Sequence, residues 1–132
     1  EIGTRAACKE ELDFAKKQRV QILTVQQILE DGLKKTLQKI GNSLSDFDKV
    51  YLTIDMDALD PAFAPAVQNP EPDGLDTHTL LELLYEVCKC SIAAFDLVEV
   101  APHYDNGTTA MQATKIILET LCYIEKRRKA QV

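Results

Sequence analysis

Two short apolar segments, residues 50–54 and 92–98, constrain the fold of this chain most strongly. Both are rich in strand-favouring residues, and each is followed at once by a carboxylate, Asp55 or Glu99. Between them, leucines at helical spacing follow a capping residue at Asp76 or Thr77. Strands that alternate with helices form parallel sheets of βαβ units, so we predict an α/β fold with a mainly parallel sheet.

The rest of the chain continues this alternation. Residues 10–17 predict a short helix and residues 20–24 a strand. Apolar residues at helical spacing predict one helix over residues 25–40, which Gly41 and Asn42 would end. A last helix is expected after Gly107.

The most informative motif is the D-x-D-x-x-D-P spacing of Asp55, Asp57, Asp60 and Pro61. Aspartate is common in turns, and a single Asp after a strand would suggest nothing more. Here the carboxylates cluster, and strand alternation would point Asp55 and Asp57 the same way. Repulsion between them would raise a pKa unless a cation is bound, so the motif predicts a metal site.

Residues 58–75 predict a long loop, because they contain four of the five prolines. Such a segment can form neither a helix nor a central strand, and we expect it to run over the surface. Its length indicates a functional element rather than a simple connection.

Charge and composition exclude several classes of partner. The net charge is −6, so a nucleic acid is not expected as a ligand, and the basic residues 126–129 would complement the dipole of the last helix. We find neither a membrane-spanning segment nor a leader, and we expect a cytoplasmic protein. The four cysteines lack zinc-site spacing and are predicted to be free thiols. Because no methionine opens the chain, we also expect a piece of a longer polypeptide.

With these motifs in hand, the chain resembles the ureohydrolase (arginase and agmatinase) family, most of all its microbial agmatinase branch. The resemblance rests on blocks in the same order along the chain, at residues 2–5, 51–65, 69–75, 95–102 and 104–105. The combination of D-x-D-x-x-D-P with D-x-x-E-x-x-P is specific, whereas either motif alone is weak.

The resemblance implies a three-layer α/β/α sandwich with two manganese ions at the carboxyl ends of the strands. Residues 1–132 would be the C-terminal portion of one such domain, with the N-terminal half absent. It implies further that Asp55 bridges the two metals, that Asp57 binds one, and that Glu99 faces the substrate guanidinium. We expect Asn69 in the loop near the substrate and Asp60 as a support behind the metal ligands.

The implied activity is manganese-dependent hydrolysis of a guanidino substrate, most simply agmatine to putrescine and urea. Arginase, guanidinobutyrase and formimidoylglutamase activities remain alternatives within the family. The full-length enzyme would be a homo-oligomer, a trimer or hexamer, acting on a small guanidino molecule. Because the other metal ligands lie in upstream motifs, the 132 residues alone are expected to be inactive.

The chain departs from the family pattern in the loop, where Ala66, Gln68 and Asp73 replace common glycines. Fewer glycines give less freedom for positive φ, so the path of the loop beside the substrate is expected to differ. His78 and His103 do not match ligand positions and are expected to be ordinary surface histidines.

Two readings from other classes remain open at this point. Acidic α/β modules for phosphoryl transfer or receiver function also gather aspartates at strand ends, although no glycine-rich phosphate loop is found here. The second of these readings is a non-catalytic remnant that assembles with partners.

Overall fold

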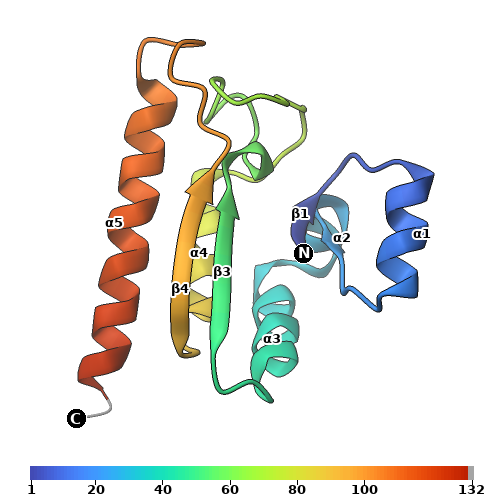
Figure 1. The fold of residues 1–132 in the computed structure, drawn as a ribbon, viewed down its shortest axis with the longest axis vertical. Helices are drawn as coiled ribbons and strands as arrows, with labels where there is room; N and C mark the ends of the chain where they lie inside the picture. The colour runs from blue at the N-terminus through green and yellow to red at the C-terminus, as the bar shows by residue number, and fades with distance from the viewer. Residues whose placement is uncertain (131–132) are drawn as a thin grey trace.

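The computed structural model describes residues 1–130 (Figure 1). Its elements are, in chain order, β1 (Ile2–Thr4), α1 (Lys9–Lys17), β2 (Leu23–Thr24), α2 (Val25–Asp31), α3 (Leu33–Leu44), β3 (Val50–Asp55), the short 3-10 helix η1 (Met56–Ala58), α4 (Thr77–Val87), β4 (Ile92–Val98) and α5 (Thr108–Lys129). In this part of the chain, no helix is long and apolar enough to cross a membrane.

The strands pair in parallel, as predicted, but they form two separate two-stranded sheets. β1 pairs with β2, and β3 pairs with β4 in a register that sets Thr53 opposite Asp96 and Asp55 opposite Val98. Because the β3–β4 pair is parallel and connected through α4, both strands end at the same edge, where their arrowheads lie in Figure 1.

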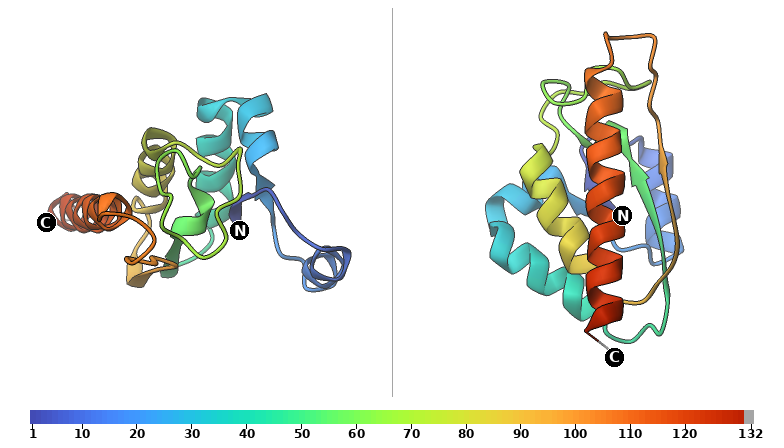
Figure 2. Two further views of the ribbon diagram at one scale, coloured as in Figure 1. Left: turned by 90° about the horizontal axis from the view of Figure 1, so that it is seen from above. Right: turned by 90° about the vertical axis from the view of Figure 1, so that its left-hand side faces the viewer.

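Helices α4 and α5 lie on one side of the β3–β4 sheet, as the two views of Figure 2 show. Alternate residues of β3 point into the core, where Ile54 is buried with Leu80, Leu83 and Leu84 of α4. The residues between them, such as Tyr51, lie on the opposite, exposed face. The described residues therefore provide the helical layer on only one face of this sheet.

The predicted helix over residues 25–40 is in fact two helices. Gly32 has φ 74° and ψ 155°, a conformation that breaks the helix between α2 and α3. The stop predicted at Gly41 and Asn42 is wrong, because α3 continues to Leu44. Glycine in a helix interior costs only about 1 kcal/mol, and tertiary packing outweighs it here.

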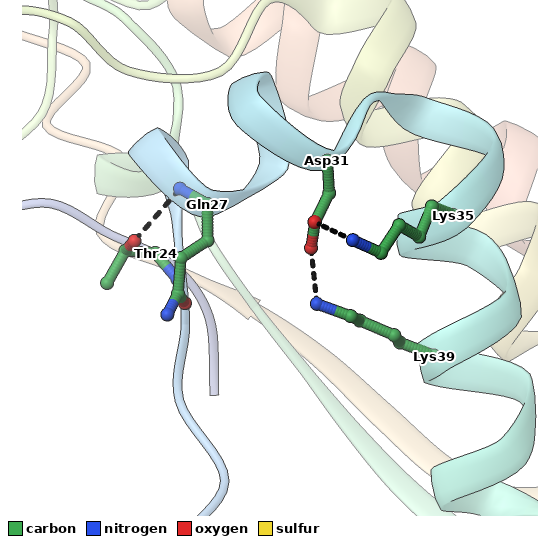
Figure 3. A network of polar contacts seen from close by, with 5 residues as sticks. All are labelled: Thr24, Gln27, Asp31, Lys35 and Lys39. Atoms are coloured by element: carbon green, nitrogen blue, oxygen red, sulfur yellow. Dashed lines mark hydrogen bonds and ion pairs between the residues drawn. The ribbon is translucent and has the colours of Figure 1, made fainter.

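The corner between β2, α2 and α3 is stabilised by neighbours in the sequence (Figure 3). Thr24 Oγ1 accepts a hydrogen bond from Gln27 N, and the Gln27 side chain accepts one in return from Thr24 N, which forms a capping box. Asp31 pairs with both Lys35 and Lys39 across the break at Gly32.

Two other predictions are corrected by the structure. The strand expected over residues 20–24 is only two residues long, because Leu23 and Thr24 alone pair with β1. The proline-rich loop does not run over the surface throughout, because Ala64, Ala66 and Val67 are fully buried. Its small apolar residues allow the middle of the loop to enter the core.

Candidate functional site

Two of the predicted site residues follow the carboxyl ends of the parallel strands. Asp55 ends β3 and pairs with Val98, and Glu99 is the next residue after Val98 in β4. The loop of residues 58–75 rises from the same edge of the sheet (Figure 1). Open α/β sheets bind ligands at such edges.

Asp55 and Asp57 are close together, but not for the reason that strand alternation suggested. The strand ends at Asp55, which caps η1 by accepting a hydrogen bond from Asp57 N at 2.8 Å. Although more than a third of the Asp55 side chain is exposed, desolvation raises the pKa of its carboxyl group, and the nearby Asp57 charge adds to the rise. The Asp57 N–H and the Arg5 guanidinium oppose it. A cation beside Asp55 would relieve this repulsion.

The Asp57 carboxylate has one paired and one unpaired oxygen. Asn69 Nδ2 donates to Asp57 Oδ2 at 3.1 Å, which connects the predicted loop residue to the predicted metal ligand. Asp57 Oδ1 is buried, and within residues 1–130 it has no hydrogen-bond partner. Buried carboxylate oxygens are rarely left unpaired in native proteins, so this oxygen is suited to a ligand.

Glu99 shows the same feature together with an unusual backbone. Its φ is 64°, in the left-handed region that few residues other than glycine adopt. Its Oε2 atom is buried and lacks a hydrogen-bond partner among the described residues. Strain of this kind is often found at functional sites, and here it coincides with an unpaired carboxylate oxygen.

Asp60 organises the base of the loop. Its Oδ1 accepts a hydrogen bond from Ala62 N at 2.8 Å and its Oδ2 accepts one from Gly74 N at 3.1 Å. These backbone N–H groups lower the pKa of Asp60 below its ordinary value. Asp60 N also donates to Leu75 O, and Leu75 N donates to Ala58 O, so backbone hydrogen bonds join the two ends of the loop. Asp60 thus supports the segment that carries Asn69.

Arg5 is joined to the same loop and was not predicted as a site residue. Its Nε donates to the carbonyl oxygens of Glu71 and Pro72, and its Nη2 donates to those of Glu71 and Leu59. Arg5 belongs to one of the sequence blocks that carry the resemblance. Its partners lie 54 to 67 residues away, so spacing along the chain gave no sign of them.

A second network, around Thr109, was also missed. The Thr109 hydroxyl accepts a hydrogen bond from Ala66 N at 2.9 Å and donates to Asp105 Oδ2 at 2.8 Å. Ala101 N donates to Ala66 O, so the middle of the loop is attached both to α5 and to the segment after Glu99. Gly107, the N-cap of α5, has no side chain that could cap the helix. A polar residue in the first turn, such as Thr109, could therefore have suggested this role.

The site faces a large hollow of about 1540 Å³, lined by Arg5, Asp55, Asp57 and Asn69 among others. Glu99 is not among the described residues that line it. In residues 1–130 no three His, Cys, Asp or Glu side chains converge on one point as a complete metal site would require. The donor set that is present, two neighbouring carboxylates with a buried unpaired oxygen, suits part of a site for a hard or borderline cation such as Mn²⁺.

The structure also shows the exposure of the two histidines, the state of the four cysteines and the backbone conformation of Asp73. His78 and His103 are exposed. The four cysteines are free thiols, as predicted, and burial raises the pKa of the Cys88 thiol to about 11. Asp73 has φ 64°, so the loop has a positive φ at a position where the resemblance implied a glycine. Aspartate tolerates this conformation better than most residues.

Comparison with known proteins places this chain in a family. The agmatinase of Neisseria meningitidis serogroup C (strain 053442) is 36% identical over 130 residues, which is 98% of this chain and 40% of that protein. The crystal structure of agmatine ureohydrolase of Thermoplasma volcanium superposes with a TM-score of 0.86 at 32% identity and covers 99% of this chain and 43% of that one.

Proclavaminate amidino hydrolase from Streptomyces clavuligerus gives the same TM-score at 35% identity, covering 96% of this chain and 41% of its own. The chain thus spans about two fifths of the length of the relatives it matches. These structures show that its α/β fold is that of the arginases and agmatinases. The Arginase family model matches residues 1–122, and the chain belongs to the arginase family.

Proposed function

We propose that this chain is the C-terminal part of a manganese-dependent ureohydrolase that converts agmatine to putrescine and urea. One observation carries the proposal: Asp57 Oδ1 and Glu99 Oε2 are buried carboxylate oxygens without a hydrogen-bond partner in residues 1–130. Leaving such an oxygen unpaired destabilises the folded protein. Cationic ligands at this edge of the sheet, a metal ion at one and a guanidinium at the other, would pair both.

Asp55 and Asp57 would hold the metal ions. Carboxylates are suitable ligands for Mn²⁺. Burial raises the pKa of Asp55, the nearby Asp57 charge adds to the rise, and a bound cation would oppose both. When bound, a pair of such ions would lower the pKa of water so that hydroxide is available near neutral pH. Asn69 holds Asp57 by its second oxygen and so limits the rotation of that carboxylate.

Glu99 would bind the guanidinium of the substrate. A carboxylate and a planar guanidinium form charge-assisted hydrogen bonds that fix the orientation of the cation. The left-handed backbone of Glu99 sets the direction of its side chain, and the Ala101 to Ala66 hydrogen bond holds the following segment against the loop. Orientation of the substrate by such a group lowers the entropic part of the barrier.

The relatives support agmatine first and other guanidino compounds second. Two are named for agmatine, from Neisseria meningitidis and Thermoplasma volcanium, and one for the amidino group of proclavaminate. A formimidoylglutamase from Bacillus subtilis also superposes with a TM-score of 0.86, at 30% identity. Because the chain belongs to the arginase family, we no longer propose a phosphoryl-transfer or receiver function for it.

The test is urea release by the longer polypeptide that contains this chain, purified, loaded with Mn²⁺ and offered agmatine, arginine or 4-guanidinobutyrate. We expect urea from agmatine, and no urea from an Asp55→Asn variant that retains the fold by circular dichroism. Urea from arginine or 4-guanidinobutyrate in preference to agmatine would correct the substrate. No urea from any of the three would contradict the proposal and favour a non-catalytic remnant.

A further inference from the structure

We propose that Arg5 is a positioning residue, which joins Leu59 at the start of the loop 58–75 to Glu71 and Pro72 near its end and thereby keeps Asn69 beside Asp57. The inference deepens the proposed function and rests on it, because Asp57 matters only if the site binds metal and substrate. Within residues 1–130 no hydrogen bond joins Arg5 to Asp57, although the Arg5 charge acts on Asp55, and Arg5→Lys retains that charge. Arg5 acts through the backbone of the loop.

The contacts of Arg5 join the two ends of the loop. Near the start, Leu59 O accepts from Arg5 Nη2 at 3.3 Å. Near the end, Glu71 O accepts from Nη2 at 2.6 Å and from Nε at 2.9 Å, and Pro72 O accepts from Nε at 3.2 Å. One side chain therefore bonds three carbonyl groups that lie up to 13 residues apart in the loop.

The chemistry of arginine suits this task. The guanidinium is planar and carries several N–H donors in a fixed fork, whereas lysine offers one compact charge on a flexible stem. A lysine at position 5 would keep the charge but could not hold the carbonyls of Leu59, Glu71 and Pro72 in the same geometry. Arg5→Lys thus tests the geometry of the side chain separately from its charge.

The end of the loop depends on this contact because its backbone offers few bonds of its own. Pro70 and Pro72 have no N–H, and residues 69–73 lie outside every helix and strand of the fold. The hydrogen bonds of Asp60 and of the Leu75 backbone hold the end of the loop only from Gly74 onward. Asn69 lies two residues before Glu71, so movement of Glu71 is passed directly to it.

Loss of the Arg5 contact should therefore affect substrate binding more than the chemical step. Asn69 and Glu71 line the hollow in front of Asp55 and Asp57. A displacement of about 1 Å can change rates by as much as 100-fold when it moves the reacting groups themselves. Arg5 moves the loop and not the strand ends, so the expected result is a rise in KM with a smaller change in kcat.

The experiment compares Arg5→Lys, Arg5→Gln and the control Arg19→Gln in the longer polypeptide loaded with Mn²⁺. Arg19 is exposed, and its replacement by glutamine removes the same charge. Steady-state kinetics with agmatine would give KM and kcat separately. Hydrogen exchange read by mass spectrometry would report the amides of residues 58–75 against those of α4 and α5.

We expect both Arg5 variants to raise KM for agmatine at least about 10-fold, within the range found for residues that orient metal-site ligands, with kcat changed less than about 3-fold. Exchange should become faster in residues 58–75 and stay unchanged in α4 and α5, and Arg19→Gln should match the wild type in both readouts. If Arg5→Gln fails to fold, Arg5→Lys alone decides.

Unchanged KM in a folded Arg5 variant would overturn the inference, whether or not the loop exchanges faster. So would faster exchange spread equally over α4 and α5, which would mark a general structural role. If the wild-type polypeptide releases no urea, the proposed function fails by itself. Unchanged loop exchange in Arg5→Lys would then overturn the closing of the loop, and faster exchange confined to residues 58–75 would support it.

Discussion

The loop 58–75 and the corner between α2 and α3 are both breaks in regular structure, but they are stabilised in opposite ways. At the corner, Thr24 pairs with Gln27 and Asp31 pairs with Lys35 and Lys39, all within eight residues (Figure 3). The loop is held by Arg5 and Thr109, whose partners lie more than 40 residues away in the chain.

Burial differs in the same direction for the Thr109 contact, although the hydrogen bonds of Arg5 to Glu71 and Pro72 are exposed. The lysines at the corner are at least half exposed, and such ion pairs contribute little to stability. The Thr109 hydroxyl and the Ala66 amide are buried, where the loss of a hydrogen-bond partner costs much more. The segment carrying Asn69 therefore takes its shape from the tertiary fold, whereas the corner takes its shape from the local sequence.

The largest effect is expected at the unpaired oxygen of the site. Asp57→Asn in the longer polypeptide should lower urea release by more than about 100-fold, beyond the loss that removal of a supporting residue causes. The melting temperature of the metal-free protein should not fall, because the substitution removes the charge of a carboxylate with a buried, unpaired oxygen in residues 1–130 and keeps one oxygen that can accept from Asn69. Urea assays and metal-free thermal melts measure the two effects.

Asp46→Asn is the matched control, because Asp46 is an exposed acid outside the site. It should leave urea release unchanged. A melting temperature that drops in Asp57→Asn, together with retained activity, would show that Asp57 is a structural residue and not a ligand.

The next largest change in unfolding free energy is expected at Gly74 in the loop, and it contrasts with the change expected at Gly41 in a helix. A methyl group at Gly74 would lie 2.4 Å from Asp60 N, and the backbone there cannot yield, so Gly74→Ala should cost about 2–3 kcal/mol of unfolding free energy. At Gly41 in α3 the nearest atom is the flexible Glu86 carboxylate at 3.0 Å, and Gly41→Ala should stabilise by about 0.5–1 kcal/mol. Urea denaturation of the two variants measures both, and equal effects would end the contrast between loop and helix.

The buried hydroxyl of Thr109 tests the tie between the loop and α5. Thr109→Val keeps the shape of the side chain but leaves Ala66 N without its acceptor, at a cost of about 1–3 kcal/mol. Thr109→Ser retains the hydroxyl and should cost less than Thr109→Val. Denaturation of both variants gives the answer, and a larger loss in the serine variant would mean that packing of the methyl group matters more than the hydrogen bond.

The start of α4, where the loop ends, supplies a test by pH. The Thr79 hydroxyl and backbone N–H hold the pKa of Asp76 below its ordinary value. A carboxyl group whose pKa is lower in the folded state adds stability above its unfolded pKa, near 3.9, and that stability is lost as the pH falls through the folded pKa.

Asp76→Asn should therefore match the wild type at neutral pH, because asparagine caps helices equally well. Below about pH 4 the wild type should lose stability relative to the variant. Denaturation curves between pH 7 and the acid limit measure this difference. A difference that stays constant over the whole range would show that Asp76 does not titrate with folding.

The sequence predicted the elements that local patterns define. The parallel β3–β4 pair follows from two apolar runs around an amphipathic helix, and the lack of regular structure in residues 58–75 follows from their prolines. The break at Gly32 was missed because helical periodicity continues on both sides of it, and a glycine inside such a pattern is not always a stop.

The supports of the candidate site could not be predicted from the sequence. Asp55, Asp57 and Glu99 were predicted as site residues from their positions after strands and from the resemblance, but strand alternation gave the wrong reason for the closeness of Asp55 and Asp57. The role of Arg5 depends on carbonyl groups that any residue could supply, so no residue type marks them. Burial of Ala66 is likewise a result of tertiary packing.

The smallest effect is expected at the corner, and it should depend on salt. Asp31 pairs with Lys35 and Lys39, which lower the pKa of its carboxyl group, but both lysines are at least half exposed. Asp31→Asn should lower the melting temperature slightly at low ionic strength and not at all at about 1 M salt, where charges are screened beyond about 3 Å. Thermal melts at the two salt concentrations measure this. A loss that persists at high salt would mean that Asp31 stabilises the break at Gly32 by hydrogen bonding, and the corner would then resemble the loop.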